Sequence, residues 1–299
     1  MKQSAFNTPA HGKVSRREHA FTLIDLLVMI ATVALLAAMC LSALAMTRPN
    51  AQAFQCLYNH KQLMRAFRMY ADDNSDGMVH SGYGGPIVNG RPVWLTGSAS
   101  FTGAGTSGWV NWWSGVGQSA GTPYVAGGPL WPYSGQQPSL YRCPADPIFI
   151  NATPPLPPGF KAGQYPRIRS ISMSQVFGVG EWQPASKFKL YSIYATIDLP
   201  SKTFVFIDEH PNSINDAAFG WSDDPQTIVD YPASNHDDRG AGLSFADGHA
   251  EIHRWLSTEI SPPYIPGNTS LLPGARKWPA TPQGHADVAW MCDHNTVHQ

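Results

Sequence analysis

The feature that most constrains this chain is an apolar run near its N-terminus. From Leu26 to Met46 there are 21 consecutive residues without a charged side chain. At a rise of about 1.5 Å per residue, a helix of this length matches the ~30 Å hydrocarbon core of a bilayer. Arg16 and Arg17 precede the run, and basic residues favour the cytoplasmic side. The run therefore predicts a single-pass inner-membrane protein with a cytoplasmic N-terminus and a body exported to the periplasm or cell surface.

Three other export signals share some of these features. A secretory signal peptide is one, because Ala43-Leu44-Ala45 offers a cleavage site, although its apolar core is normally only about 7–15 residues long. A lipoprotein signal would use Cys40, but Met39 before it is larger than that processing normally requires. A twin-arginine signal would use Arg16-Arg17, but the apolar residues expected directly after the pair are absent. None of the three explains Asp25 at the start of the run.

The segment AFTLIDLLVMIA, which includes Asp25, resembles the N-terminus of type IV prepilins and type II secretion pseudopilins. The resemblance implies cleavage between Ala20 and Phe21 and methylation of the new Phe21 amine, both by a prepilin peptidase/methyltransferase. The family has Gly where Ala20 stands and Glu where Asp25 stands. It implies that Asp25 pairs with the Phe21 amine of a neighbouring subunit, since a lone carboxylate in lipid costs about 2.5–3.5 kcal/mol at mid-membrane. The implied function is that of a structural subunit of a pilus-like or secretion-type filament, assembled with other pilin or pseudopilin subunits through the N-terminal helix.

The rest of the sequence predicts an exported, loop-rich α+β head. Charged residues are sparse, at 14%, whereas the chain has 27 Gly, 26 Pro and 10 Trp, which favours short strands over a helical bundle. Apolar residues recur at helical spacing over 49–75, so the long N-terminal helix is expected to be transmembrane first and then amphipathic. Residues 1–20 carry a net charge of +3 and the remainder −4, and a mildly acidic body argues against nucleic-acid binding.

The expected fold is a long N-terminal helix packed on an antiparallel β-sheet head, as in pilins. Its expected parts are a basic leader (1–20), the transmembrane helix (21–48), its amphipathic continuation (49–75), the α+β head (76–255) and a Pro-rich tail (256–299). Residues 203–208 and about 168–173 are expected to form strands of the sheet.

A β-hairpin over 241–255 is the part of the head that the sequence predicts most clearly. Asp247-Gly248 lies between two alternating runs and predicts a two-residue turn. In that register Phe245 faces Ala250 and Leu243 faces Ile252, so these four residues share one apolar face.

The C-terminal part carries a second resemblance, to exported prepilin-like proteins with a His-x9-Asp-Gly motif near their C-terminus. Here the motif is His236 and Asp247-Gly248, with ten residues between them rather than nine. The segments 55–74, 140–147 and 206–220 are also similar to this group.

Two cysteines are expected in the exported head, Cys56 on the amphipathic helix and Cys143 in the segment YRCPAD. Because an exported domain meets an oxidising compartment, a Cys56–Cys143 disulfide is the favoured interpretation. The alternative is a pair of unpaired, buried thiols.

Acidic and histidine side chains concentrate in two segments of the head and suggest a divalent metal. His249 lies on the side of the hairpin opposite Phe245, which suits a metal and suits a solvated sheet face equally well. The alternative function is therefore an exported metal-dependent binding or catalytic domain on a pilin-type anchor. Nucleophile-elbow, phosphate-loop and paired-cysteine motifs are absent from the sequence, so no enzyme is predicted. The candidate ligands are Asp208, Glu209, His210, His236, Asp247 and His249.

Overall fold

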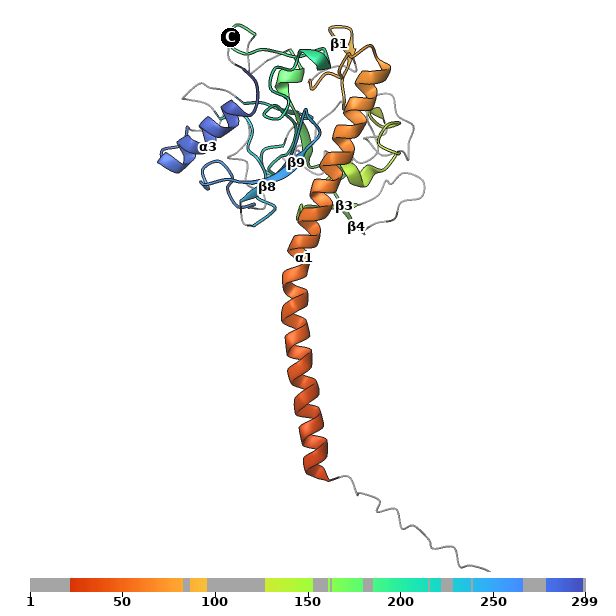
Figure 1. Cartoon of the computed structure of the whole chain (residues 1–299), viewed down its shortest axis with the longest axis vertical. Helices are drawn as coiled ribbons and strands as arrows, with labels where there is room; N and C mark the ends of the chain where they lie inside the picture. Colours follow the sequence, from red (N-terminus) through yellow and green to blue (C-terminus); the bar gives the residue numbers. More distant parts are fainter. Residues whose placement is uncertain are drawn as a thin grey trace, which may run out of the picture. The chain divides into compact units, whose positions relative to one another are not determined.

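The chain divides into two units in a computed structural model (Figure 1), Met1–Thr47 and Arg48–Gln299. The structure describes residues 22–82, 87–95, 127–152, 161, 163–179, 185–214, 216–221, 228–237, 239–265 and 278–297. Helix α1 (Leu23–Asp73) contributes residues to both units.

The first turn of α1 is closed by a capping box. The backbone N–H of Thr22 donates to Asp25 Oδ2 at 3.0 Å, and the N–H of Asp25 donates to Thr22 Oγ1 at 3.2 Å. The Thr22 hydroxyl also donates to Asp25 Oδ2, at 2.7 Å. These bonds satisfy two backbone donors that a helix start leaves unpaired, so Asp25 has a local structural role at the N-terminus of α1.

The predicted transmembrane helix over 21–48 is wrong. Within the described part of the chain, no helix combines the length and apolar character that a membrane crossing requires. The predicted single-pass location in the inner membrane is therefore not supported either.

The second unit is built on a five-stranded mixed sheet with the strand order β7-β5-β6-β8-β9. Its strands are β5 (Ile171–Ser174), β6 (Phe204–Asp208), β7 (Ala218–Phe219), β8 (Gly240–Phe245) and β9 (Ala250–Arg254). β5, β6, β8 and β9 pair antiparallel with their neighbours, whereas β7 runs parallel to β5. β7 follows β6 in the chain but pairs with the edge of β5 that lies away from β6. The predicted fold class, an antiparallel head on a transmembrane helix, is therefore wrong in both the sheet and the helix.

Shorter elements surround this sheet. Two small hairpins are formed by β1 (Ile87–Val88) with β2 (Arg91–Pro92) and by β3 (Phe149–Ala152) with β4 (Gly163–Pro166). The 3₁₀ turns are η2 (Pro138–Tyr141), η3 (Gln175–Phe177) and η4 (Tyr194–Thr196). η2 leads directly into the segment that carries Cys143.

Two apolar clusters hold helices on the sheet. One joins α1 to the sheet and includes Phe67 and Phe206, whose rings meet edge to face with centroids 5.9 Å apart. The other joins the sheet to helix α3 (Pro282–Asp293) and includes Leu243 and Met291. In Figure 1, β8 and β9 lie between α3 and the C-terminal half of α1. The sheet is thus covered by different elements on its two faces, and β8 is buried along its whole length.

The hairpin of β8 and β9 forms one residue out of the predicted register. Leu243 pairs with Glu251 and Gly242 pairs with Ile252, so the predicted pairing of Leu243 with Ile252 is wrong. The turn has three residues rather than two, because Ala246 is buried and its N–H donates to Thr203 O at 2.9 Å. Gly248 takes a φ of +97°, which is the left-handed position of a three-residue hairpin loop.

The histidine on β9 is packed against a helix. His253 does not face open solvent, because the ring of Trp290 on α3 stacks on it with centroids 3.7 Å apart. α3 itself begins at a Thr281 cap, whose Oγ1 accepts from Gly284 N at 3.1 Å. The segment expected to be a Pro-rich tail therefore supplies a packed helix.

Candidate metal centre

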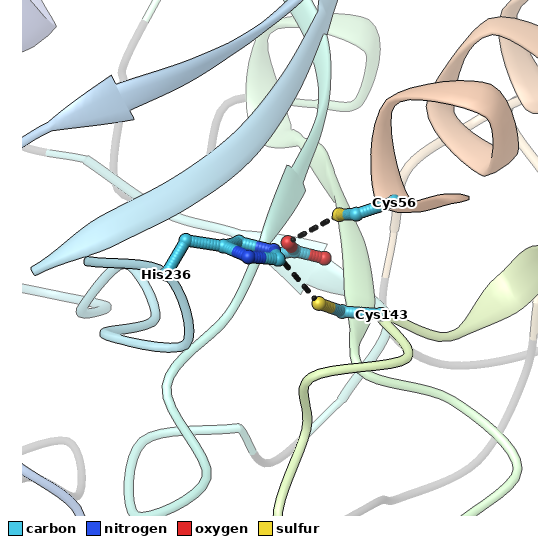
Figure 2. Close-up of side chains that lie close together, drawn as sticks. Cys56, Cys143 and His236 are labelled. Carbon is cyan, nitrogen blue, oxygen red and sulfur yellow. Dashed lines mark hydrogen bonds between the residues drawn. The ribbon is translucent and has the colours of Figure 1, made fainter. Parts of the chain in front are cut away.

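Four side chains from distant parts of the second unit converge in its interior. The possible ligand atoms of Cys56, Cys143, Asp208 and His236 all lie within 4.8 Å of one another, and all four residues are buried. Figure 2 shows the two cysteines and His236 pointing toward a common centre. A tetrahedral ion with two sulfur, one nitrogen and one oxygen ligand needs these atoms about 3–4 Å apart.

Each ligand is delivered by a different element. Cys56 lies on α1, Cys143 in the loop after η2, and Asp208 at the end of the central strand β6. His236 lies in the loop before β8 and is held by a bridge to Gly240, in which the N–H of each residue donates to the carbonyl of the other. The four residues thus connect α1, two loops and the sheet at one point.

The polar contacts within the cluster form two pairs. Cys56 Sγ donates to Asp208 Oδ2 at 3.1 Å. Cys143 Sγ and His236 Nε2 are also 3.1 Å apart. Nε2 is the ring nitrogen that faces the cluster, which is the orientation that a histidine ligand requires.

Outer contacts fix the ligand side chains. Asp208 Oδ2 accepts from Gly242 N at 3.0 Å, and Asp208 Oδ1 is 3.3 Å from His60 Nε2, one turn of α1 beyond Cys56. The N–H of Cys143 donates to Ser170 Oγ at 2.8 Å. Hydrogen bonds of this kind orient metal ligands, and their loss typically costs 10–100-fold in metal affinity.

Gly242 on β8 allows α1 to approach the sheet at the cluster. A Cβ atom at this position would lie 2.7 Å from His60 Nε2 and 2.8 Å from Cys56 Sγ. Both distances are shorter than van der Waals contact, so a side chain here would displace α1 or the ligands. The glycine is therefore required by the close packing of β8 on α1.

The electrostatics of the cluster favour an ion pair between a Cys143 thiolate and a protonated His236. Burial alone would raise the pKa of Cys143, but hydrogen bonds with Cys56 and His236 outweigh burial and lower that pKa. Burial likewise opposes the charged form of His236, yet its contacts with Cys143 raise its pKa. For Cys56, burial followed by its contact with Cys143 raises the pKa well above the usual value. The Cys143 thiol is thus the more readily ionised of the two.

A lowered cysteine pKa beside a histidine also suits a nucleophile. Access excludes that chemistry here, because the Cys143 residue is 0% exposed and His236 only 5%. A substrate would have to reach a sulfur covered on all sides by protein. Four buried ligand groups with no open position are typical of a structural metal site.

The predicted Cys56–Cys143 disulfide is wrong. The two sulfurs lie in the same cluster, but Cys56, Cys143 and Cys292 are all unbridged in the described part of the chain. Cys56 Sγ lies 3.1 Å from Asp208 Oδ2 and Cys143 Sγ lies 3.1 Å from His236 Nε2, and the two sulfurs are not covalently bonded.

Of the six predicted metal ligands, the structure places only Asp208 and His236 in the buried cluster. Glu209 is buried apart from the cluster and accepts from Ser172 Oγ at 2.5 Å. His210 turns its Nε2 to the carbonyl of Pro262, at 2.9 Å.

Asp247 and His249 lie at the exposed hairpin turn. Asp247 Oδ1 and His249 Nδ1 are 2.6 Å apart, and their side chains are 37% and 41% exposed. They bind each other at the surface, whereas the metal-ligand cluster is buried. Sequence reasoning missed Cys56 and Cys143 as metal ligands, because no short Cys-x-x-Cys spacing marks them.

Two of the three predicted processing residues, Ala20 and Phe21, lie outside the described residues. Asp25 is described, and its hydrogen bonds with Thr22 lower the pKa of its carboxyl group.

Comparisons with known proteins found no match: no family model, no curated protein and no solved structure matches the chain.

Proposed function

We propose that the second unit is a metal-stabilised structural domain whose ion is bound by Cys56, Cys143, Asp208 and His236. The observation that carries the proposal is the convergence of four ligand atoms within 4.8 Å in a buried site. Buried acids and thiols are costly when they are left as isolated charges. A divalent cation at their centre would offset that cost and satisfy all four groups at once.

The ligand set favours zinc. Thiolate ligands suit soft or borderline ions, and a mixed site of sulfur, imidazole and carboxylate with four ligands suits Zn²⁺. Calcium and magnesium prefer all-oxygen sites with six or more ligands. The ion would join α1, the η2 loop, β6 and the loop before β8, and so secure the helix to the sheet.

The experiment compares zinc binding and thermal stability of the full-length chain with and without chelator. Free zinc at a thousandfold excess over Kd adds about 4 kcal/mol by mass action. For a domain of this size that corresponds to a Tm higher by about 8–16 °C. Cys143→Ser should abolish both zinc binding and the zinc-dependent rise in Tm.

Cys292→Ser is the matched control, because Cys292 lies outside the cluster, where its sulfur accepts from Trp221 Nε1 at 3.3 Å. This variant should bind one zinc ion per chain, as the wild type does. Absence of bound zinc, or identical behaviour of Cys143→Ser and Cys292→Ser, would contradict the proposal.

A separate observation on the first unit favours a second function, that of a filament subunit. The five consecutive residues Leu26–Ile30 are all apolar and are 45–60% exposed. Five residues exceed one helical turn, so every side of the helix is apolar here. We infer that other copies of this chain cover it, several to each helix, in line with the resemblance of this segment to filament-forming pilins.

Assembly is tested by sedimentation and electron microscopy of the full-length chain. Val33→Gln with Leu36→Gln should reduce assembly, because the two side chains are 60% and 61% exposed on the apolar helix. Leu199→Gln with Leu256→Gln is the matched control, with side chains 47% and 56% exposed in the second unit. Equal assembly of the two double variants, or a monomeric wild type, would contradict the proposal.

A further inference from the structure

A pocket of about 600 Å³ lies in the second unit, between the turn of the β1–β2 hairpin, the end of η3 and residues 190–193. Its apolar lining includes Val179, Leu190 and Ile193. Arg91 on β2 also lines the pocket, and none of the described lining residues is acidic. A volume of this size is typical of small-molecule sites.

The guanidinium group of Arg91 lies at the wall of this pocket. Its Nη1 donates to Tyr191 O and its Nη2 donates to Gly178 O, each at 3.4 Å, and both acceptors belong to lining residues. These bonds are longer than the usual N–H···O distance of about 2.7–3.2 Å. An arginine has further N–H donors, and those of Arg91 donate to no acceptor among the described residues. Much of its hydrogen-bonding capacity is therefore left for a ligand.

Arg91 has no counter-charge among the described residues. Burial lowers the pKa of Arg91, and the one group whose charge opposes this effect is Tyr70. Burial also raises the pKa of the Tyr70 hydroxyl. The pKa of His80 is lowered to about 4 by burial and by Arg91 itself. Tyr70 and His80 are therefore neutral at neutral pH, and neither balances the positive charge of Arg91.

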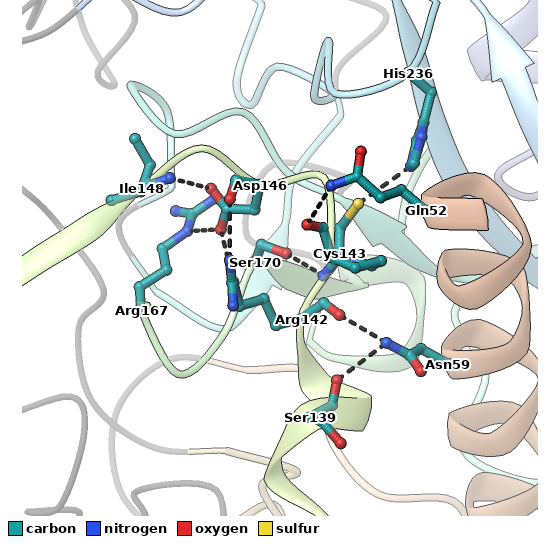
Figure 3. Close-up of polar contacts among 11 residues, drawn as sticks. Gln52, Asn59, Ser139, Arg142, Cys143, Asp146, Ile148, Arg167, Ser170 and His236 are labelled. Atoms are coloured by element: carbon teal, nitrogen blue, oxygen red, sulfur yellow. Dashed lines mark hydrogen bonds and ion pairs between the residues drawn. The ribbon is translucent and has the colours of Figure 1, made fainter. Parts of the chain in front are cut away.

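Two other arginines of the second unit show the usual arrangement. Arg142 and Arg167 both reach the carboxylate of Asp146, as Figure 3 shows. Arg91 is also partly buried, but it has no such partner in the described part of the chain. A cation removed from water without a counter-charge is costly, so an anion that enters the pocket would be stabilised.

We propose that this pocket binds a small organic monocarboxylate, with its carboxylate at Arg91 and its hydrocarbon part against Val179, Leu190 and Ile193. The planar fork of N–H donors on an arginine matches the two oxygens of a carboxylate. One arginine balances a single negative charge, whereas a phosphate group carries about two at neutral pH. The inference uses no metal ligand and no residue of the first unit, so it does not depend on either proposed function.

The test is an NMR titration of the full-length chain with hexanoate, acetate, hexanamide and hexyl phosphate, which yields a dissociation constant for each. Hexanoate should bind. Hexanamide has the same hydrocarbon part without the charge, and acetate has the same head group without most of the hydrocarbon part. Each of these two should bind at least tenfold more weakly than hexanoate. Hexyl phosphate should bind no more tightly than hexanoate.

Each ligand can contradict one part of the proposal. Absence of hexanoate binding, or equal binding of hexanamide, would overturn the anion site. Equal binding of acetate would overturn the role of the apolar lining. Tighter binding of hexyl phosphate would overturn the choice of a carboxylate over a phosphate ligand.

Variants locate the binding in this pocket. Arg91→Gln should weaken hexanoate binding about tenfold or more, the usual effect of losing a hydrogen bond to a charged group. Arg65→Gln makes the same charge change at an exposed position of α1 outside the pocket and should bind hexanoate as the wild type does. Equal affinity of the two variants would refute the assignment to Arg91.

A second variant covers the case in which Arg91→Gln fails to fold. Ser192 is exposed and lines the pocket, so Ser192→Phe places a large ring there and leaves Arg91 intact. Ser201→Phe is the matched control, because Ser201 is exposed outside the pocket. Hexanoate binding should be lost in Ser192→Phe and kept in Ser201→Phe, and unchanged binding in Ser192→Phe would place the carboxylate elsewhere.

Discussion

Substitution of Gly242 by alanine tests how closely β8 packs on the metal-ligand cluster. The new Cβ would lie 2.7 Å from His60 Nε2 and 2.8 Å from Cys56 Sγ, whereas ordinary van der Waals contact begins at 3.4 Å. The neighbours must therefore move by more than half an ångström. Overpacking of this kind costs about 1–3 kcal/mol of stability.

The same substitution should also weaken zinc binding. Both displaced side chains belong to the site. Cys56 is one of the four ligands, and His60 contacts the ligand Asp208. A disturbed ligand shell typically loses 10–100-fold in affinity, or about 1.4–2.7 kcal/mol. We expect Gly242→Ala to reduce the free energy of unfolding by about 2.4–5.7 kcal/mol with zinc bound and by about 1–3 kcal/mol in chelator.

Urea unfolding followed by tryptophan fluorescence measures both values. Gly163→Ala on β4 is the matched control, because among the described residues the nearest atom to its Cβ, Tyr165 Cε2, would lie 3.9 Å away. This control should be neutral or stabilised by a few tenths of a kcal/mol through the entropy of the unfolded chain. Equal unfolding free energies for Gly242→Ala and Gly163→Ala would refute the close-packing argument.

Two further predictions concern parts of the second unit away from the metal. Burial lowers the pKa of His80 to about 4, against about 6.5 in an unfolded chain, so the neutral ring stabilises the fold above pH 6.5. That stability is lost as the pH falls toward 4, by about 2 kcal/mol at pH 5. In urea unfolding, His80→Asn should reduce the dependence of the unfolding free energy on pH. An unchanged pH dependence in this variant would contradict the prediction. Asp287 on α3 accepts from the N–H groups of Leu256 and Ser257 at 2.9 and 2.8 Å. Asp287→Ala should therefore cost about 2–3 kcal/mol in the same assay, and a change below 0.5 kcal/mol would show that these bonds do not secure α3.

The local elements of the head could be predicted where one segment determines its own structure. The strand expected over 203–208 is confirmed as β6, Phe204–Asp208. Apolar and polar residues hardly alternate in this strand, but a run of four apolar residues before an Asp is typical of a buried strand.

The hairpin register could not be predicted from its own sequence. Asp247-Gly248 favours a two-residue turn, but Ala246 is drawn into the loop by bonds to Thr203 and Tyr194. These partners lie more than 40 positions away in the chain, so tertiary contacts rather than the local turn sequence determine the length of the loop. The capping signals of α3, Thr281 followed by Pro282, are present in the sequence, although the Pro-rich composition of 256–299 led to the expectation of a tail.

The metal centre was predictable only in part, for a similar reason. Asp208 and His236 were among the expected ligands, but so were four residues that the fold directs elsewhere. Cys56 and Cys143 are 87 positions apart, and two distant cysteines in an exported domain favour a disulfide on general grounds. Only the tertiary structure shows that each sulfur turns toward an acidic or imidazole partner.

X-ray absorption at the zinc edge, on full-length chain loaded with one equivalent of zinc, tests the metal centre most directly. The four-ligand site predicts two sulfur neighbours at about 2.3 Å and two nitrogen or oxygen neighbours at about 2.0–2.1 Å. A zinc ion surrounded only by nitrogen and oxygen, or a chain that retains no zinc after dialysis, would contradict the account.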